Sequence, residues 1–308
     1  MKSKSIYFAT VLALVTACIS GINTFIAKIA VTGISDPILF TTLKNGIVAI
    51  LCIGILIGFK KWPEICILKK RQWWKLLAIG IVGGSVPFAL FFTGLAKTGA
   101  LNAALIHKTL FLWVLILGIP FLHERLTRLQ WLGVAALFCA NLFVGGFSGF
   151  SLNVGELMIL IATILWAVEN IIAKKVLRDV SSSIVMTARM FFGSMALLGW
   201  VFIQSNVSII GILGVEQWGW ILLTSVLLFG YVSTWYTALK YAPATYVASI
   251  LVSGTLITNI LSAIFIKHVF TGSDFFISSL YAAGVVFLIV FTRKTGECSN
   301  LSITQSSK

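Results

Sequence analysis

The chain of 308 residues is 59% hydrophobic and only 10% charged, with a formal net charge of +14. Soluble domains carry about 25% charged residues, so this chain has too little polar surface to cover a globule in water. The composition therefore excludes an ordinary soluble enzyme and indicates an integral membrane protein with lipid as its solvent. Most of the positive charge lies in short connections between apolar runs, which is typical of membrane topology and not of a nucleic-acid surface.

Ten apolar runs are long enough to cross a bilayer as helices, which takes about 20 residues each. The first run continues to about Val31 without a small-residue cleavage pattern, so we expect an uncleaved span and not a signal peptide. We therefore predict an all-α integral membrane protein. Its ten transmembrane helices are predicted at residues 6–31, 37–59, 76–96, 100–122, 129–148, 155–175, 183–203, 218–240, 245–266 and 273–292.

The connections alternate between basic and nearly uncharged. Residues 32–36 and 149–154 contain no basic residue, and 204–217 carries only Glu216, whereas Lys97 and Lys267 are exceptions at the edges of two outer turns. The basic residues of the other connections are Lys60, Lys61, Lys69, Lys70, Arg71, Lys75, Arg125, Arg128, Lys174, Lys175, Arg178, Lys240, Arg293 and Lys294. Because basic loops stay in the cytoplasm, we predict a multi-pass protein of the plasma (inner) membrane with both termini cytoplasmic.

Short sequences recur between the two halves of the chain. The stretch "TFIAK", ending at Lys28, matches "NIIAK", ending at Lys174, and "TLKNG" around Lys44 falls where "TARMF" around Arg189 falls. The offset between the matched positions drifts only from about 146 to 144 residues. With five spans per half, the second half enters the membrane from the opposite side.

The chain is thus predicted to contain two inverted five-helix repeats, residues 1–150 and 151–294, and a disordered cytoplasmic tail at 295–308. Inverted repeats are the plan of many secondary transporters, whose substrate sites lie near the membrane midplane between the repeats.

Two longer stretches, "HERLTRLQWLGVAALFCANLFV" and "ALKYAPATYVASILVSGTLITNILSAIFI", point to a family. Together with a basic residue in the second span of each half, they make residues 6–292 resemble the EamA-type members of the drug/metabolite transporter (DMT) superfamily. The resemblance implies a ten-span carrier of small metabolites, often an exporter. One motif departs from the pattern, because Glu124 of "HERLT" has His268 near its counterpart in the second half.

Charged residues inside a bilayer are costly and mark candidate functional sites. Glu169, which occupies the place of Asn23 in the other half, and Arg189 both lie about 9 Å below the cytoplasmic end of their spans. We expect the two charged side chains to pair directly. The pair serves either the scaffold or a gate with proton coupling, and Asn23 belongs to the same candidate gate.

The first half carries Lys44, His107 and Lys108 without an acidic residue at the same depth. His107 and Lys108 align with Leu251 and Val252 in the second half, so the scaffold does not need a basic pair there. An anionic cargo would supply the missing charge. In the alternative reading, Lys108 extends towards the lipid head groups or binds carbonyls freed by a kink at Pro87.

Aromatic residues form a second group of candidates. Trp166, Trp235, Tyr236 and Tyr241 either line a cargo path or belong to the aromatic belts at the membrane surfaces. The five cysteines show no metal-ligand spacing, and we expect no metal and no cofactor.

These observations favour a secondary-active transporter, an exporter by the family resemblance, for a small anionic or zwitterionic metabolite. The substrate contacts are predicted at Lys108, Lys44, His107, Trp166, Trp235 and Tyr236. Alternatives are an exporter of amphipathic or aromatic compounds and a non-transporting scaffold or sensory protein. The expected partners are a small molecule, the lipid bilayer and a proton as coupling ion, with no nucleic acid and no enzymatic activity.

Overall fold

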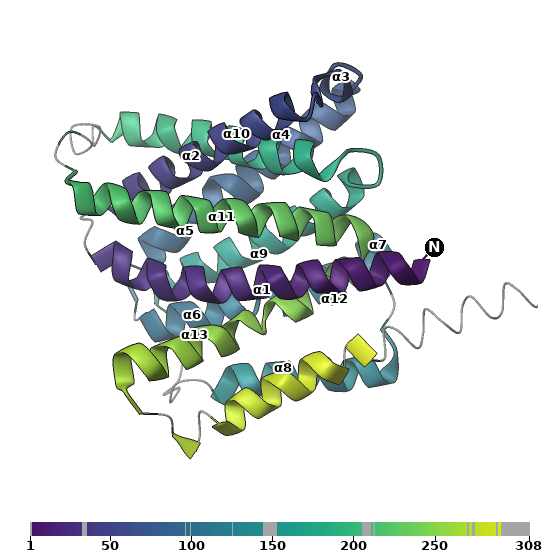
Figure 1. Ribbon diagram of the computed structural model, residues 1–308, viewed down its shortest axis with the longest axis vertical. Coiled ribbons are helices and arrows are strands. Elements are labelled where there is room, and N and C mark those ends of the chain that lie inside the picture. The colour runs from purple at the N-terminus through teal and green to yellow at the C-terminus, as the bar shows by residue number, and fades with distance from the viewer. Residues whose placement is uncertain are drawn as a thin grey trace, which may run out of the picture.

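A computed structural model describes residues 2–32, 36–95, 97–98, 100–124, 126–143, 153–204, 211, 213–269, 271–272, 275–287 and 289–290. The regular elements within these ranges are helical (Figure 1). The first half contains α1 (Lys2–Thr32), α2 (Pro37–Gly58), α3 (Trp62–Cys66), α4 (Lys70–Gly84), α5 (Val86–Leu95), α6 (Ala100–Lys108), α7 (Leu110–Leu122) and α8 (Arg128–Phe143). The second half contains α9 (Val154–Val176), α10 (Ser182–Ile203), α11 (Val215–Tyr241), α12 (Ala244–Leu251), α13 (Gly254–Ser262), a π-helical turn η2 (Ala263–Lys267) and a last apolar helix Phe275–Phe287.

Eight helical stretches in the described part of the chain are long and apolar enough to cross a membrane, and Arg128–Ala140 and Phe275–Phe287 are shorter apolar helices. Large apolar side chains such as Ile50, Ile116 and Val226 are exposed on the outside of the bundle. A soluble monomer rarely exposes so much apolar surface, whereas a surface that faces lipid requires it. The chain is therefore a multi-pass membrane protein.

The third predicted span was expected to begin at residue 76, but α4 begins at Lys70. The predicted connection over 60–75 is therefore too long, because its last six residues are helical. The first turn of α4 is fixed by the side chain of Gln72, whose Oε1 accepts the backbone N–H of Lys69 at 2.8 Å. Trp73 and Trp74 are exposed on this added turn. The helix extends beyond its apolar part because basic and indole side chains are stable at the head-group level.

Helices from opposite halves lie side by side in this bundle (Figure 1). The most extensive contacts join α1 to α11, α2 to α10, α5 to α9 and α4 to α10. The N-terminus, α3 and the turn between α11 and α12 lie at the same end of the bundle, at the right of Figure 1. This end carries the basic residues Lys60, Lys61 and Lys240, as the alternation of charge predicts.

Glycine pairs allow the closest helix crossings. Gly84 of α4 and Gly193 of α10 lie so close that a Cβ added at Gly193 would come within 2.6 Å of the Gly84 Cα. Gly94 of α5 and Gly155 of α9 form a similar crossing. Small residues at helix interfaces let backbones approach and maximise dispersion contacts, which stabilise membrane helices where water cannot.

Two of the long helical stretches are interrupted at matched positions, between α6 and α7 and between α12 and α13. The hydroxyl of Thr109 donates to the carbonyl of Ile106 at 2.6 Å where α6 meets α7, and that of Ser253 donates to the carbonyl of Ile250 at 2.7 Å where α12 meets α13. Thr109 and Ser253 are 144 residues apart, which is the offset found between the two halves of the sequence. His107 and Lys108 directly precede the first of these interruptions.

Glu124 and Lys174 hold the turn between α11 and α12 from both sides. The Glu124 carboxylate accepts the backbone N–H groups of Ala244 at 2.6 Å and Thr245 at 2.9 Å, at the start of α12. The Lys174 ammonium donates to the carbonyls of Leu239 at 2.6 Å and Ala242 at 2.7 Å, at the end of α11. Each charge satisfies backbone groups that a helix end leaves unpaired and complements the helix dipole. Lys174 thus serves the scaffold.

The sequence comparison placed the counterpart of Glu124 near His268, whereas the structure places it one residue later, at Val269. His123 and His268 both adopt the left-handed conformation, with φ of 56° and 53°, and lie 145 residues apart. His268 therefore corresponds to His123, and the exposed Val269 takes the place of Glu124. The Glu124 contact to α12 is consequently specific to one half.

Replacement of Lys174 by Met is expected to lower the free energy of unfolding by about 1.5–3 kcal/mol, since it removes charge-assisted hydrogen bonds to otherwise unpaired carbonyls. Thermal unfolding of the purified protein in detergent measures the effect. Lys175→Met is the matched control, because the neighbouring Lys175 is exposed and donates to no carbonyl in the described structure. Equal melting temperatures for the two variants would contradict the role assigned to Lys174.

Candidate functional site

The carbonyl of Gly83 is the centre of a buried polar network. Pro87 has no N–H, so the carbonyl four residues before it loses its helical partner, and the helix is interrupted at Ser85 between α4 and α5. Two side chains of the second half take the freed carbonyl. The indole Nε1 of Trp166 donates to it at 3.0 Å, and Nη2 of Arg189 donates at 3.2 Å. The kink of the first half is thereby held by α9 and α10.

A glycine is required at position 83 because the side chains of the second half fill the space beside it. A Cβ built on Gly83 would collide with Cγ of Glu169 and would come within 3.2 Å of Nε of Arg189. The missing side chain of Gly83 therefore lets Glu169 and Arg189 pack against the backbone of α4. Sequence reasoning missed this role of Gly83, for which the nearby Pro87 is a local signal.

Glu169 and Arg189 lie in one network, but they do not form the direct ion pair that we expected. The hydroxyl of Tyr236 donates to Oε1 of Glu169 at 2.6 Å, and the Arg189 guanidinium lies over the Tyr236 ring, 5.9 Å from its centre. In the part of the chain that the structure describes, Lys61–Glu64 is the sole ion pair within 4.0 Å. Each charge has a neutral partner instead, since Tyr236 offers a donor and Gly83 an acceptor.

His107 lies in an aromatic cluster next to this network. Its ring centre is 4.8 Å from that of Trp166 and 5.3 Å from that of Phe91, and the Phe88 ring centre is 5.3 Å from that of Trp166. The His107 Nδ1 is buried and accepts or donates no hydrogen bond among the described residues. Trp166 consequently joins His107 to the Gly83 carbonyl, because one indole contacts both.

Lys108 and Lys44 lie within the bundle without a countercharge among the residues that the structure describes. Lys108 is half-buried, and none of the described residues forms a hydrogen bond or an ion pair with its ammonium. Lys44 is 6% exposed and places its ammonium 5.4 Å from the centre of the Phe40 ring. The carbonyl freed by Pro87 is held by Trp166 and Arg189, so it does not supply the structural partner that the alternative interpretation assigned to Lys108.

Two asparagines of the first half remain unsatisfied. Within the described ranges, Oδ1 of Asn23 on α1 is buried without a hydrogen-bond partner, and no hydrogen bond joins this residue to Lys44. Both side-chain atoms of Asn45, next to Lys44, are buried and unpartnered as well. Sequence reasoning missed Asn45, although an amide beside an intramembrane lysine is a signal of polarity at that depth.

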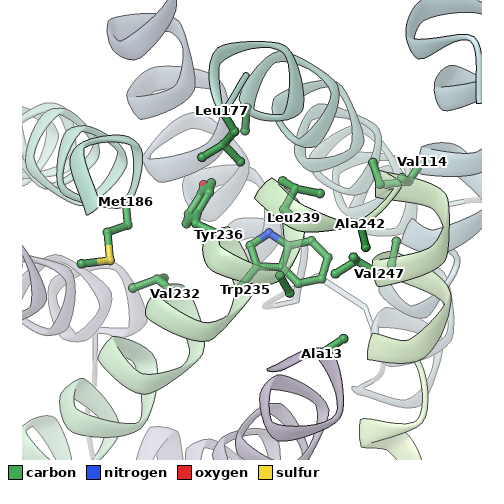
Figure 2. Packing of buried hydrophobic residues seen from close by; sticks show 14 of the residues in the cluster. Ala13, Val114, Leu177, Met186, Val232, Trp235, Tyr236, Leu239, Ala242 and Val247 are labelled. Atoms are coloured by element: carbon green, nitrogen blue, oxygen red, sulfur yellow. The ribbon is translucent and has the colours of Figure 1, made fainter. Parts of the chain in front are cut away.

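The aromatic candidates separate into two groups. Trp166, Trp235 and Tyr236 are buried, and the Trp235 indole donates to Oδ1 of Asn170 at 3.2 Å. Figure 2 shows Trp235 and Tyr236 on α11 within the buried cluster, among Leu177, Leu239 and Val247. Tyr241 is exposed and packs edge-on against the Phe8 ring, as a residue of an interfacial belt does.

No group of three or more metal-ligating residues lies together among the described residues. The cysteines that the structure describes are free thiols: Cys18, Cys52, Cys66 and Cys139. A surface depression of about 300 Å³ lined by Ala263, Ile264, His268 and Val269 includes no residue of the network around Gly83. The polar groups assembled by α4, α6, α9, α10 and α11 therefore form the candidate site.

A transporter family matches the chain over most of its length. The model of the EamA-like transporter family matches it twice, at residues 7–146 and 153–290. A protein of Sinorhizobium sp, "Uncharacterized transporter in cobO 3'region", is 30% identical over 137 residues, which cover 44% of this chain and 94% of that protein. "Uncharacterized transporter YyaM" of Bacillus subtilis is 28% identical over 128 residues, 40% of this chain and 42% of that protein.

A protein of Methanothermobacter thermautotrophicus, "Uncharacterized transporter", is 26% identical over 113 residues, 35% of this chain and 33% of that protein. The matched segments thus span less than half of two of the three relatives. A solved structure titled "Crystal structure of protein" superposes with a TM-score of 0.75 over 93% of this chain and 98% of its own. Its sequence identity is 14%, so it supports the fold alone.

Proposed function

Since the chain belongs to the EamA-like transporter family, we propose that it is a secondary-active carrier that exports a small organic anion or zwitterion by alternating access. Membrane transport follows from the family. The charge of the cargo is inferred from Lys108 on α6, at the edge of the candidate site, and from Lys44 on α2, outside that set of helices. Both lie inside the bundle without an acidic partner among the described residues. This observation carries the proposal, because an unpaired charge inside a membrane protein is costly and calls for a counterion.

The comparison of the two halves strengthens this assignment. Lys108 and Val252 hold equivalent positions before the matched interruptions at Thr109 and Ser253. The second half folds with an apolar side chain there, so the scaffold does not require a cation. A feature that is costly, unpaired and limited to one half is better explained by cargo than by folding.

Ten spans in two inverted repeats are part of the proposal. Its support is the exchange of partners between the halves: α1 packs on α11 of the second half, and α9 packs on α4 and α5 of the first. The equivalent turns at His123 and His268 and the double match of the family model agree with this symmetry. Alternating access is then a movement of one repeat against the other, around polar groups that both contribute.

Glu169 is our candidate for proton coupling. It is a buried carboxylate whose Oε1 accepts from a neutral hydroxyl, and the Arg189 charge lies nearby without a direct ion pair. Such a group gains or loses a proton without breaking a salt bridge. Asn23 occupies the equivalent place in the other half and cannot titrate, so one proton-binding group of this kind is proposed per chain.

A second candidate function is export of amphipathic or aromatic compounds. The aromatic cluster of Phe91 and Trp166 beside His107, extended by Phe88 and Phe92, favours it, since such rings stack with planar cargo. Thermal stabilisation of the purified protein by organic anions, zwitterions and uncharged aromatic compounds distinguishes the two. We expect anions or zwitterions to raise the melting temperature. Stabilisation by uncharged compounds alone would contradict the anion carrier and support the second candidate.

The orientation in the plasma membrane is tested by cysteine labelling. In a background without the native cysteines, Ile67→Cys in the connection after α3 and Val215→Cys at the start of α11 place exposed thiols at predicted opposite surfaces. A membrane-impermeant maleimide is expected to label position 215 in intact cells and position 67 only after lysis. Labelling of position 67 from outside would reverse the proposed topology.

A further inference from the structure

The guanidinium of Arg189 has one edge that is only half used. Nε and Nη2 point their N–H groups in the same direction, and this pair of donors matches the two oxygens of a carboxylate. Nη2 donates to the single carbonyl oxygen of Gly83 at 3.2 Å, whereas Nε is buried and has no hydrogen-bond partner in the described part of the chain. The whole side chain is only 8% exposed, so solvent does not complete the edge.

From this geometry we propose that the Nε–Nη2 edge of Arg189 is the carboxylate-binding element of the cargo site, with the Gly83 carbonyl as its occupant in the absence of cargo. The inference rests on the proposed function and refines it, because it assigns the anionic group of the cargo to the carboxylate class. A carboxylate bound to both donors satisfies Nε and exchanges a neutral acceptor for a charged one. A planar fork of this kind selects carboxylates by geometry, which the point charge of a lysine does not.

Tyr236 holds the acid that would otherwise pair with this edge. Glu169 lies beside Arg189 over Gly83, close enough that a Cβ at position 83 would meet both side chains. Its Oε1 accepts the Tyr236 hydroxyl at 2.6 Å, which directs the carboxylate away from a direct pair with the guanidinium. Without that hydroxyl, the two N–H donors of Arg189 would be the best remaining contact of the Glu169 carboxylate.

Cargo binding at this edge is thereby linked to the kink in the third span. A carboxylate that takes Nη2 of Arg189 releases one of the two donors on the Gly83 carbonyl and leaves the Trp166 indole at 3.0 Å. This carbonyl is free to be held from outside its own helix only because Pro87 lacks an N–H. When cargo is bound, we therefore expect α10 to hold the kinked segment of the third span more weakly.

The test measures binding to the purified full-length protein in lipid nanodiscs by thermal stabilisation. The probes are lactate, succinate and benzoate, each beside its uncharged amide, with glycerol phosphate as an anion of another geometry. We expect at least one carboxylate to bind more tightly than its amide. Arg189→Lys keeps the positive charge but loses the fork, and is expected to weaken that carboxylate at least about tenfold.

A second pair of variants tests the internal competition and remains informative if Arg189→Lys does not fold. Tyr236→Phe is expected to weaken carboxylate binding, because Glu169 is then free to occupy the edge. Adding Glu169→Gln to Tyr236→Phe is expected to restore binding, since the competing charge is removed. A purely structural role of Tyr236 predicts no such restoration.

The outcomes separate this inference from the proposed function. If a carboxylate binds to the wild type and to Arg189→Lys with equal affinity, or if Tyr236→Phe leaves its affinity unchanged, the fork is overturned while the anion carrier stands. Binding of glycerol phosphate but of no carboxylate likewise overturns the fork and leaves the anion carrier standing. If only the uncharged amides bind, or if none of the probes binds, both the carboxylate site and the anion carrier are contradicted.

Discussion

Replacement of Lys108 by Met is expected to leave a folded protein that binds its anionic cargo about ten- to a hundredfold more weakly, the loss of one charge-assisted contact of about 1.5–3 kcal/mol. Met retains the length of the side chain and removes its charge and donors. Folding is expected to persist because the described structure gives the ammonium no hydrogen bond or ion pair to lose. Binding or counterflow in vesicles, with folded protein quantified beside it, measures the effect.

Two further variants make this prediction specific. Lys108→Arg is expected to retain more affinity than Lys108→Met, although not all of it, because the guanidinium is larger and planar. His107→Leu is expected to be milder, since adjacent helical residues diverge by about 100° and the imidazole already packs against Trp166. Unchanged affinity in a well-folded Lys108→Met protein would return this residue to the scaffold.

Replacement of Gly193 by Ala is expected to destabilise the protein severely. The added Cβ would lie 2.6–2.7 Å from the backbone of Gly84, and a backbone cannot rotate away as a side chain can. Overpacking of a well-packed interior costs typically about 1–3 kcal/mol, and here α4 and α10 must separate along the crossing that precedes the Pro87 kink. Loss of folded protein in size-exclusion chromatography and a lower melting temperature report the effect.

The same helix offers a matched control for this substitution. Gly199, also on α10, has no atom within 4 Å of its added Cβ. Gly199→Ala is expected to leave the melting temperature unchanged or to raise it slightly, because alanine is the better helix former. If both variants behave alike, the α4–α10 crossing does not depend on glycine.

The positions of the helices could be predicted because their signal is local. Each apolar run of about 20 residues indicates a span by itself, and Pro87 indicates the interruption that the structure places at Ser85. The start of the third helix at Lys70 escaped prediction because hydropathy marks the apolar part of a helix. The turns that extend into the head-group region carry basic and indole side chains, which resemble a loop in the sequence.

The site could be predicted only in part, because its geometry depends on contacts between halves. Counting residues along the predicted spans placed Glu169 and Arg189 at the same depth in the membrane, and the structure places both beside Gly83. It did not reveal that Glu169 accepts a hydrogen bond from Tyr236 and that Arg189 donates to the Gly83 carbonyl, so that the two charges do not pair with each other. No local pattern in a single sequence indicates which of several polar neighbours will form the hydrogen bond with a buried charge.

The roles of Glu124 and Lys174 illustrate the same limit. The sequence shows that both halves carry a lysine there, Lys28 and Lys174. That the Lys174 ammonium would bind the end of α11 while Glu124 binds the start of α12 depends on where the turn between those helices lies. The partners are 65 and 120 residues apart in the chain, beyond the reach of motif reasoning.

Counterflow in proteoliposomes tests the central claim, that this protein carries a small organic anion, most directly. Vesicles that contain the purified protein are loaded with the unlabelled anion that best stabilises it, and entry of the labelled anion is followed. We expect saturable, transient accumulation that Lys108→Met strongly reduces and that vesicles without protein do not show. Entry at the rate of protein-free vesicles, or counterflow of uncharged compounds alone, would contradict the claim.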